Sequence, residues 1–261
     1  MTASSRALPE FLIVGAQKAG TTSLNAYINQ HPKIIPSWKK EVHYFDGGLD
    51  PNHDNFSMGS SWYRAHFPTS AQLTAKQSKT FEASPSYLFN PLAAERIKRL
   101  VPDVKIIIML RNPAERAISH YYHEKRKGRM NLSLDQALLE EDQIFSNGIG
   151  EIDYKSNEFV RRSFKARGIY VDQVKRYFDV FGRGNVHVVD SDSLFTNPKS
   201  VLNDVFEFIG IPRYEDVDFS PRNVGMKKSV ESDRVYEELK AYFEAHNEKL
   251  YDLLGERFAW D

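Results

Sequence analysis

Residues 11–23 constrain the fold of this chain more than any other stretch. The apolar residues Phe11 to Val14 are typical of a buried strand, and a glycine-bounded loop, Gly15 to Gly20, leads from them into a helix start. Such a loop turns successive backbone N–H groups toward one point, and the N-terminus of the helix adds about half a positive charge. The stretch therefore predicts a site for an anionic group such as a phosphate or a sulfate.

The lysine of this loop does not lie where nucleotide triphosphatases carry it. In those proteins the lysine follows the second glycine and precedes a hydroxyl residue that binds magnesium. Here Thr21 follows Gly20, and Lys18 lies inside the loop. Lys18 would then reach the oxygens of a bound group from a different side. On this stretch alone, a structural turn with an incidental lysine remains an alternative.

A second buried strand is expected from Val104 to Leu110, beside the first, because its uninterrupted apolar residues are typical of a strand covered on both faces. Arg111 follows it, where a metal-dependent phosphotransferase usually has an aspartate that holds magnesium. Ligand contacts gather at the carboxyl ends of parallel strands, so Arg111 and Ser119 on the next helix are expected near a nucleotide phosphate. This pattern favours neutralisation of an anion by Lys18 and Arg111 without a metal.

Strand and helix patterns alternate along the chain. Strands are expected at 33–36, 79–84 and 186–189, and helices at 22–30, 91–100, 113–122, 133–145, 169–181, 198–210 and 233–254. This alternation predicts an α/β fold, with a P-loop-like, mainly parallel β-sheet and helices on both faces. We expect a single domain over residues 11–261, after an N-terminal tail of residues 1–10.

Composition excludes several classes of function. Lys plus Arg and Asp plus Glu balance at 35 each, so we expect no nucleic acid as a partner. The chain has no cysteine, which excludes thiolate metal sites and suits a reducing compartment. No stretch approaches the roughly 18 apolar residues of a membrane span, and residues 1–10 lack the apolar segment of a signal peptide. We therefore expect a cytoplasmic protein with no transmembrane segment.

Three separated motifs share one resemblance. They are Phe11 to Ser23, Lys40 to Asp46, and Leu110 to Pro113 with Ser119 and Tyr121. Together they resemble the sulfotransferases that use 3′-phosphoadenosine 5′-phosphosulfate (PAPS), nearest in look to the heparan sulfate and other carbohydrate branch. The resemblance covers residues 11 to about 224. It implies transfer of a sulfuryl group from PAPS to a hydroxyl or amine, in line and without a metal.

The resemblance also implies roles for individual residues. Lys18 would stabilise the leaving phosphate, and Glu41 would be the general base, with His43 beside it as a further catalytic residue. The residues that would hold PAPS are Lys18, Ala19, Gly20, Thr21, Thr22 and Ser23 at the phosphosulfate, and Arg111 and Ser119 at the 3′-phosphate. Sulfuryl transfer needs a base at the acceptor and a cation at the leaving phosphate, which agrees with these roles.

Further residues are expected around the donor and the acceptor. The acceptor side would include Lys40, Glu82, Ser84 and Tyr87, and the donor side would include Tyr170, Arg222, Lys227 and Lys228. The segment from Glu82 resembles the one that lines the family's acceptor site. Where the animal glycan enzymes often carry a lysine after that glutamate, this chain has Ala83.

Alternatives remain open from the sequence. Arg111 could instead pair with Glu115 one helical turn on, and Glu41 and His43 could be ordinary loop charges. A P-loop kinase with an unusual loop and a non-catalytic nucleotide-binding regulator are the alternative functions. The acceptor could be a carbohydrate or another small metabolite, and the oligomeric state is open.

Overall fold

The computed structural model describes residues 5–220 and 230–260. The chain divides into two compact units, the first made of Met1–Leu110 and Arg176–Asn223 and the second of Arg111–Lys175 and Val224–Asp261. Each unit builds its own hydrophobic core.

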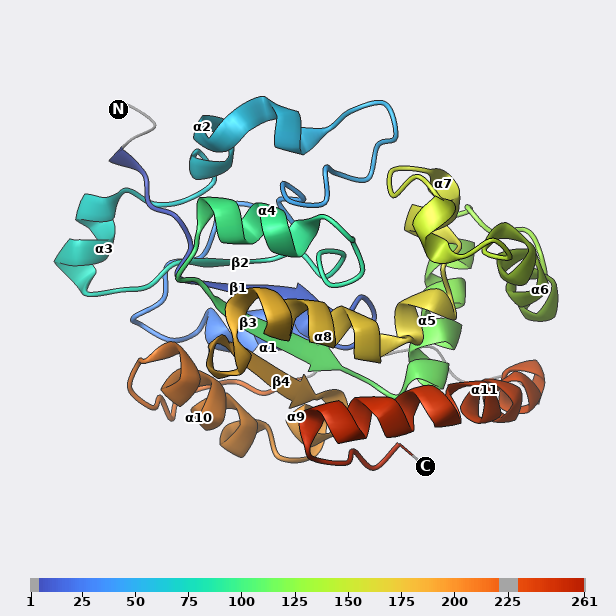
Figure 1. Ribbon diagram of the computed structural model, residues 1–261. Coiled ribbons are helices and arrows are strands. Elements are labelled where there is room, and N and C mark those ends of the chain that lie inside the picture. The colour runs from blue at the N-terminus through green and yellow to red at the C-terminus, as the bar shows by residue number, and fades with distance from the viewer. Residues whose placement is uncertain (1–4, 221–229, 261) are drawn as a thin grey trace. The chain divides into compact units, whose positions relative to one another are not determined.

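The first unit is built on a parallel sheet with the strand order β2-β1-β3-β4 (Figure 1). Its strands are β1 (Phe11–Gly15), β2 (Phe81–Ala83), β3 (Lys105–Leu110) and β4 (Val186–Asp190). β1 pairs in parallel with β2 on one side and with β3 on the other, and β4 pairs in parallel with β3. Every residue of β1 is buried, as expected for a strand covered on both faces. The predicted parallel α/β sheet is confirmed.

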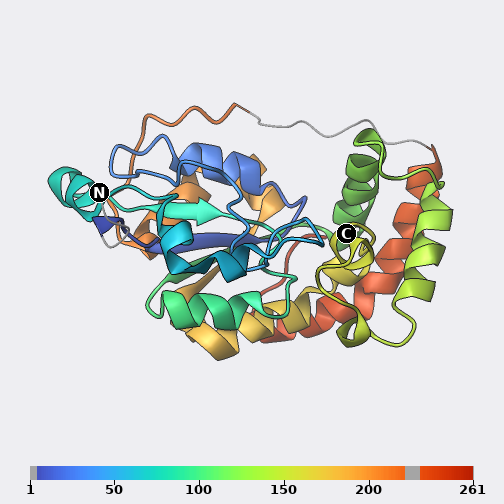
Figure 2. The ribbon, with the colours of Figure 1, turned by 90° about the horizontal axis from the view of Figure 1, so that it is seen from above.

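Helices cover both faces of this sheet. Figure 2 shows α1 (Thr21–Ile28) and α4 (Ala93–Leu100) on opposite faces. α10 (Pro198–Ile209) packs beside α1, and the end of α8 (Tyr170–Phe181) lies near α4. The other helices of this unit are α2 (Gly59–Arg64), α3 (Ser70–Lys76), α9 (Ser191–Thr196) and the 3-10 turns Asn55–Met58 and Arg183–Asn185.

The segment before residue 42 runs along the edge of β2. The short strand expected at 33–36 was wrong: only an isolated bridge joins Ile34 to Lys79, where the Ile35 N–H donates to the Lys79 carbonyl at 2.9 Å. Farther on, the Ser37 N–H donates to the Phe81 carbonyl at 2.9 Å and the Glu41 N–H donates to the Ala83 carbonyl at 3.1 Å. These bonds pair two carbonyl groups at the edge of β2, and they bring Glu41 to the carboxyl end of that strand.

The second unit is helical. It contains α5 (Pro113–Arg126), α6 (Leu134–Ile144), α7 (Asn157–Arg161), α11 (Val230–Leu254), the first part of α8 and the 3-10 turns Ile149–Glu151 and Ala166–Gly168. Its core joins apolar residues of α5, α6 and α11 around Phe164. Ser133 and Gln136 form the predicted capping box at the start of α6. Among the helices that the structure describes, none is long and apolar enough to cross a membrane.

Candidate active site

The loop after β1 packs tightly on its own unit. The Ala16 N–H donates to the Met109 carbonyl of β3 at 2.6 Å. Gly20 has φ +96°, and a Cβ atom there would lie 2.9 Å from the Met109 Cε and 3.2 Å from the ring of Phe195. A Cβ atom on Gly15 would lie 2.4 Å from the Leu88 Cβ. Glycine is therefore required at both ends of the loop, for space at Gly15 and for conformation and space at Gly20.

The start of α1 fits an anionic group. Its N-cap, Gly20, makes no side-chain capping bond, and its first turn contains no acidic residue that would compete with an anion. Lys18 is half-buried in the loop just before it. The side chains of Ala19, Thr21 and Ser23 are buried, so Ala19 offers an anion only its backbone. This part of the predicted donor site therefore suits a phosphate or sulfate through N–H groups and one lysine.

A charged network lies at the carboxyl end of β2. The His43 Nδ1 lies 2.7 Å from the Asp46 Oδ2, and the His43 Nε2 lies 3.5 Å from the Glu41 Oε2. The Lys40 ammonium lies 2.5 Å from the Glu41 Oε1. The Ser86 hydroxyl donates to the same Asp46 oxygen, and it lies 3.1 Å from the His43 Nδ1. His43 is thus held between two carboxylates, one buried and one partly exposed.

The pKa values of this network follow from its pairing. Burial alone would lower the pKa of His43, but hydrogen bonds to Asp46 and Glu41 outweigh it and raise that pKa to about 9. Partial burial alone would raise the pKa of Glu41, but hydrogen bonds from His43 and Lys40 outweigh it and lower that pKa to about 2. At neutral pH the network therefore contains an imidazolium and ionised carboxylates.

The predicted catalytic residues share an unusual backbone conformation. Among the described residues other than glycine, only four have a positive φ: Lys18 (71°), Glu41 (59°), His43 (56°) and Gln77 (49°). Gln77 is the C-cap of α3, where this conformation is common. The other three are the residues predicted to be catalytic. Left-handed conformations of non-glycine residues are strained, and they cluster at functional sites.

Sequence reasoning missed two members of the network, Asp46 and Ser86. The spacing of His43 and Asp46 could have indicated the first, because a loop readily joins side chains three residues apart. Nothing in the local sequence indicates Ser86, which approaches from the segment after β2. Among the described residues, no group of three or more His, Asp or Glu side chains is arranged to hold a metal ion.

Three residues predicted on the acceptor side are buried. Glu82, Ser84 and Tyr87 are at most 1% exposed, and they bond to the backbone of residues 42–44. These buried side chains offer no surface in this structure, and their contact with the acceptor stays a prediction. Lys40, by contrast, is one-third exposed and pairs with Glu41.

The remaining described donor residues lie in the second unit. Arg111 follows β3 directly in the chain, and its guanidinium donates to Glu115 at 2.6 and 3.1 Å, the pairing that the sequence left open as an alternative. Ser119 lies near the middle of α5 and is half-buried. Tyr170 is buried, and its hydroxyl donates to the Arg111 carbonyl at 3.0 Å, so it holds the backbone at Arg111.

The predicted donor site thus draws on both units, and its assembly from Lys18 and Arg111 stays a prediction. Arg222, Lys227 and Lys228 lie outside the described residues.

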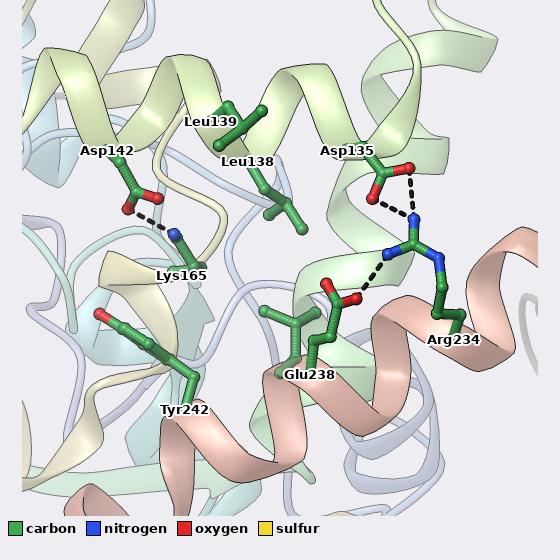
Figure 3. Close-up of a pocket in the computed structure, with 9 residues that line it drawn as sticks. Asp135, Leu138, Leu139, Asp142, Lys165, Arg234, Glu238 and Tyr242 are labelled. Carbon is green, nitrogen blue, oxygen red and sulfur yellow. Dashed lines mark hydrogen bonds and ion pairs between the residues drawn. The ribbon is translucent and has the colours of Figure 1, made fainter.

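A hollow of about 370 Å³ in the second unit contains none of the predicted site residues (Figure 3). Leu138 and Leu139 from α6 and Tyr242 from α11 contribute to its lining. Its charged groups are paired with one another: Lys165 with Asp142, and Arg234 with Asp135 and Glu238. These internal ion pairs give no indication of a ligand.

Comparison with known proteins agrees with the motifs of the site. A family model described as "Sulfotransferase domain" matches residues 8–228, which include parts of both units. A crystal structure of a sulfotransferase from Alicyclobacillus acidocaldarius is 34% identical, with a TM-score of 0.78 over 97% of this chain and 99% of the other.

Curated relatives point the same way. The membrane-associated sulfotransferase kil1 of Dictyostelium discoideum is 26% identical over 97% of this chain and 66% of its own length. A human heparan sulfate glucosamine 3-O-sulfotransferase 5 is 28% identical over 97% of this chain and 74% of its own length. The bifunctional heparan sulfate N-deacetylase/N-sulfotransferase 1 of Caenorhabditis elegans is 31% identical over 81% of this chain, which spans only 23% of that relative. With its parallel sheet, its phosphate-type loop and this family match, the chain belongs to the sulfotransferase family, a family of transferases.

Proposed function

We propose that this chain transfers a sulfuryl group from PAPS to a hydroxyl or amine of an acceptor, with Lys18 and Glu41 as the central catalytic residues. The observation that carries the proposal is the left-handed backbone shared by Lys18, Glu41 and His43. Strain of this kind persists only where the surrounding structure enforces it. The family match favours this function over the kinase and over the non-catalytic regulator.

The loop after β1 binds the donor at its phosphosulfate. When bound, the donor supplies the sulfuryl group and leaves as the 3′,5′-bisphosphate with the electrons of the broken S–O bond. Lys18 stabilises the negative charge that develops on the departing phosphate oxygen. Arg111 and Ser119 hold the 3′-phosphate, and for this Arg111 turns at least partly from Glu115.

Glu41 receives the proton of the acceptor as the acceptor atom bonds to sulfur. A carboxylate with a pKa of about 2 is a weak base, because general bases work best with a pKa near the working pH. We include in the proposal that the acceptor displaces Lys40 from Glu41, which raises the pKa of Glu41. His43 stays protonated between Glu41 and Asp46, and it orients the Glu41 carboxylate.

The proposed acceptor is a carbohydrate that carries glucosamine. Several relatives are named for heparan sulfate, which supports this acceptor. Two tryptophans add to the support: the exposed Trp38 precedes Lys40 by two residues, and the half-buried Trp62 stacks on the ring of Tyr44, which follows His43. Aromatic faces near polar groups suit sugar rings, and they also suit a small metabolite, the alternative acceptor.

A cytoplasmic location stays a prediction, which cell fractionation would test.

The test is an acceptor screen with ³⁵S-labelled PAPS. Completely desulfated heparan sulfate offers both free amines and free hydroxyls, and simple phenols and alcohols represent small metabolites. We expect label in the polysaccharide with the wild type, and at least a hundredfold less with Lys18→Ala. Label in no acceptor, or wild-type rates with Lys18→Ala, would contradict the proposal.

A further inference from the structure

A buried polar cluster lies directly beneath the charged network. It consists of the side chains of Tyr63, Glu82, Ser84 and Tyr87, hereafter the Glu82 cluster, and all of them are at most 1% exposed. Buried polar groups of this kind need hydrogen-bond partners, since an unsatisfied one is costly. Hydrogen bonds join this cluster to the backbone of the segment that carries Glu41 and His43.

Three successive backbone amides donate to the cluster. The Val42 N–H donates to the Glu82 Oε2 at 3.3 Å, and the His43 N–H donates to the Ser84 Oγ at 3.2 Å. The Tyr44 N–H donates to the Tyr87 hydroxyl at 2.9 Å. In an extended strand, successive N–H groups point to opposite sides. Here they converge as in the backbone nests that bind anions, and left-handed residues at Glu41 and His43 accompany the turn.

The Glu82 carboxylate fixes the direction of every bond in the cluster. Its Oε1 accepts from the hydroxyls of Tyr63 at 2.9 Å and Tyr87 at 2.8 Å, and its Oε2 accepts from the Ser84 hydroxyl at 3.0 Å. Above its pKa of about 7, as at pH 8, Glu82 is mainly an ionised carboxylate, which can only accept. Because the hydroxyls of Ser84 and Tyr87 each donate their single proton to Glu82, their oxygen lone pairs remain to accept from the backbone. One carboxylate thus orients both hydroxyls toward the amides.

We infer that Glu82, Ser84 and Tyr87 are positioning residues, which hold the backbone of residues 42–44 in the conformation that aims Glu41 and His43 at the acceptor. This inference rests on the proposed function, because it assumes that Glu41 works on the acceptor. The three residues act through backbone N–H groups, so the amide bonds do not involve the side chains of residues 42 and 44. In this role the three side chains hold the segment that carries Glu41 and His43, and they do not contact the acceptor themselves.

Two variants remove one backbone partner each. Tyr87→Phe removes the acceptor of the Tyr44 amide, and Ser84→Ala removes the acceptor of the His43 amide. Tyr177→Phe is the matched control. It removes another buried tyrosine hydroxyl, which donates to the Tyr87 carbonyl at 3.0 Å and makes no bond to residues 42–44.

Two readouts decide the inference, both at pH 8. The first is amide hydrogen exchange at residues 42–44 by NMR, which needs no acceptor. The second is kcat with labelled PAPS and desulfated heparan sulfate, together with the affinity for the 3′,5′-bisphosphate by calorimetry. We expect at least tenfold faster exchange and at least tenfold lower kcat in Ser84→Ala and Tyr87→Phe, with bisphosphate affinity within twofold of the wild type. Tyr177→Phe should keep exchange and kcat within twofold, whatever its loss of thermal stability.

The inference is overturned if exchange at residues 42–44 is no faster in the two variants than in Tyr177→Phe, or if both variants keep the kcat of Tyr177→Phe. Failure of the proposed function has a different signature. Glu41→Gln, assayed alongside, would then keep wild-type transfer while the exchange result still stands. If the wild type does not label this polysaccharide, the proposed acceptor fails and the exchange measurement alone decides the inference.

Discussion

Replacing Asp46 by asparagine should lower the pKa of His43. Burial of His43 opposes its charge, so its high pKa depends on the Asp46 and Glu41 carboxylates, of which Asp46 lies closer at 2.7 Å. Asparagine keeps an oxygen for the Nδ1–H but loses the charge. The rise from 6.5 to about 9 corresponds to roughly 3.4 kcal/mol, at about 1.36 kcal/mol per pKa unit. Because Asp46 contributes more than Glu41, we expect the pKa of His43 to fall by at least ~1 unit.

The assay is a titration of the histidine ring protons by NMR. The resonance of His43 is identified as the one that disappears in His43→Ala. Asp50→Asn is the matched control, because Asp50 is exposed and its side chain accepts from the Asn52 N–H. A His43 that still titrates near pH 9 in Asp46→Asn would refute the reasoning, since Glu41 alone would then account for the raised pKa.

Three further predictions concern charge, conformation and pH. Lys40→Ala should raise the pKa of Glu41 by up to ~0.7 unit, because a solvent-screened ion pair is worth about 0.2–1 kcal/mol. The acidic limb of the profile of kcat/KM against pH should therefore move to higher pH. An unmoved limb would argue against displacement of Lys40. Gly20→Ala should lower the free energy of unfolding in urea by about 1–3 kcal/mol. The loss should exceed that of Gly182→Ala, where φ is also positive (80°) but an added Cβ would have no atom within 4 Å beyond its chain neighbours. Equal losses would show that the residues packed against Gly20 move aside at no cost. Burial raises the pKa of Glu82 from 4.5 to about 7, so the stabilisation from its protonation is complete below pH 4.5 and is lost as the pH rises to 7. Between pH 5 and pH 8 the free energy of unfolding should therefore fall less in Glu82→Gln than in the wild type. An equal fall would contradict the raised pKa.

Much of the fold could be predicted from local sequence patterns. The buried strands β1 and β3, the loop into α1 and the capping box at Ser133 each follow from a few consecutive residues. α3 was missed, although Thr69 and Gln72 carry the same capping-box signal. The division into two compact units was not expected, because it depends on how α8 and the C-terminal part of the chain are shared between cores.

The candidate site was predictable in its residue types and less so in its contacts. The chemistry at Lys18, Glu41 and His43 was visible in the motifs, and their shared left-handed backbone needed coordinates. The burial of Glu82 was not predicted, because a glutamate in a short strand is more often exposed than buried. Long-range side-chain to backbone bonds leave no periodic trace in a sequence, so the support of residues 42–44 could not be predicted.

The measurement that most directly tests the account is the sulfuryl-transfer rate of Glu41→Gln under donor saturation. The enzyme is given ³⁵S-labelled PAPS and desulfated heparan sulfate, and its affinity for the 3′,5′-bisphosphate is measured in parallel. Glutamine keeps the shape of Glu41 but cannot take the proton. The account predicts at least a hundredfold lower transfer rate with bisphosphate affinity within twofold of the wild type. Transfer by Glu41→Gln at the wild-type rate would contradict it.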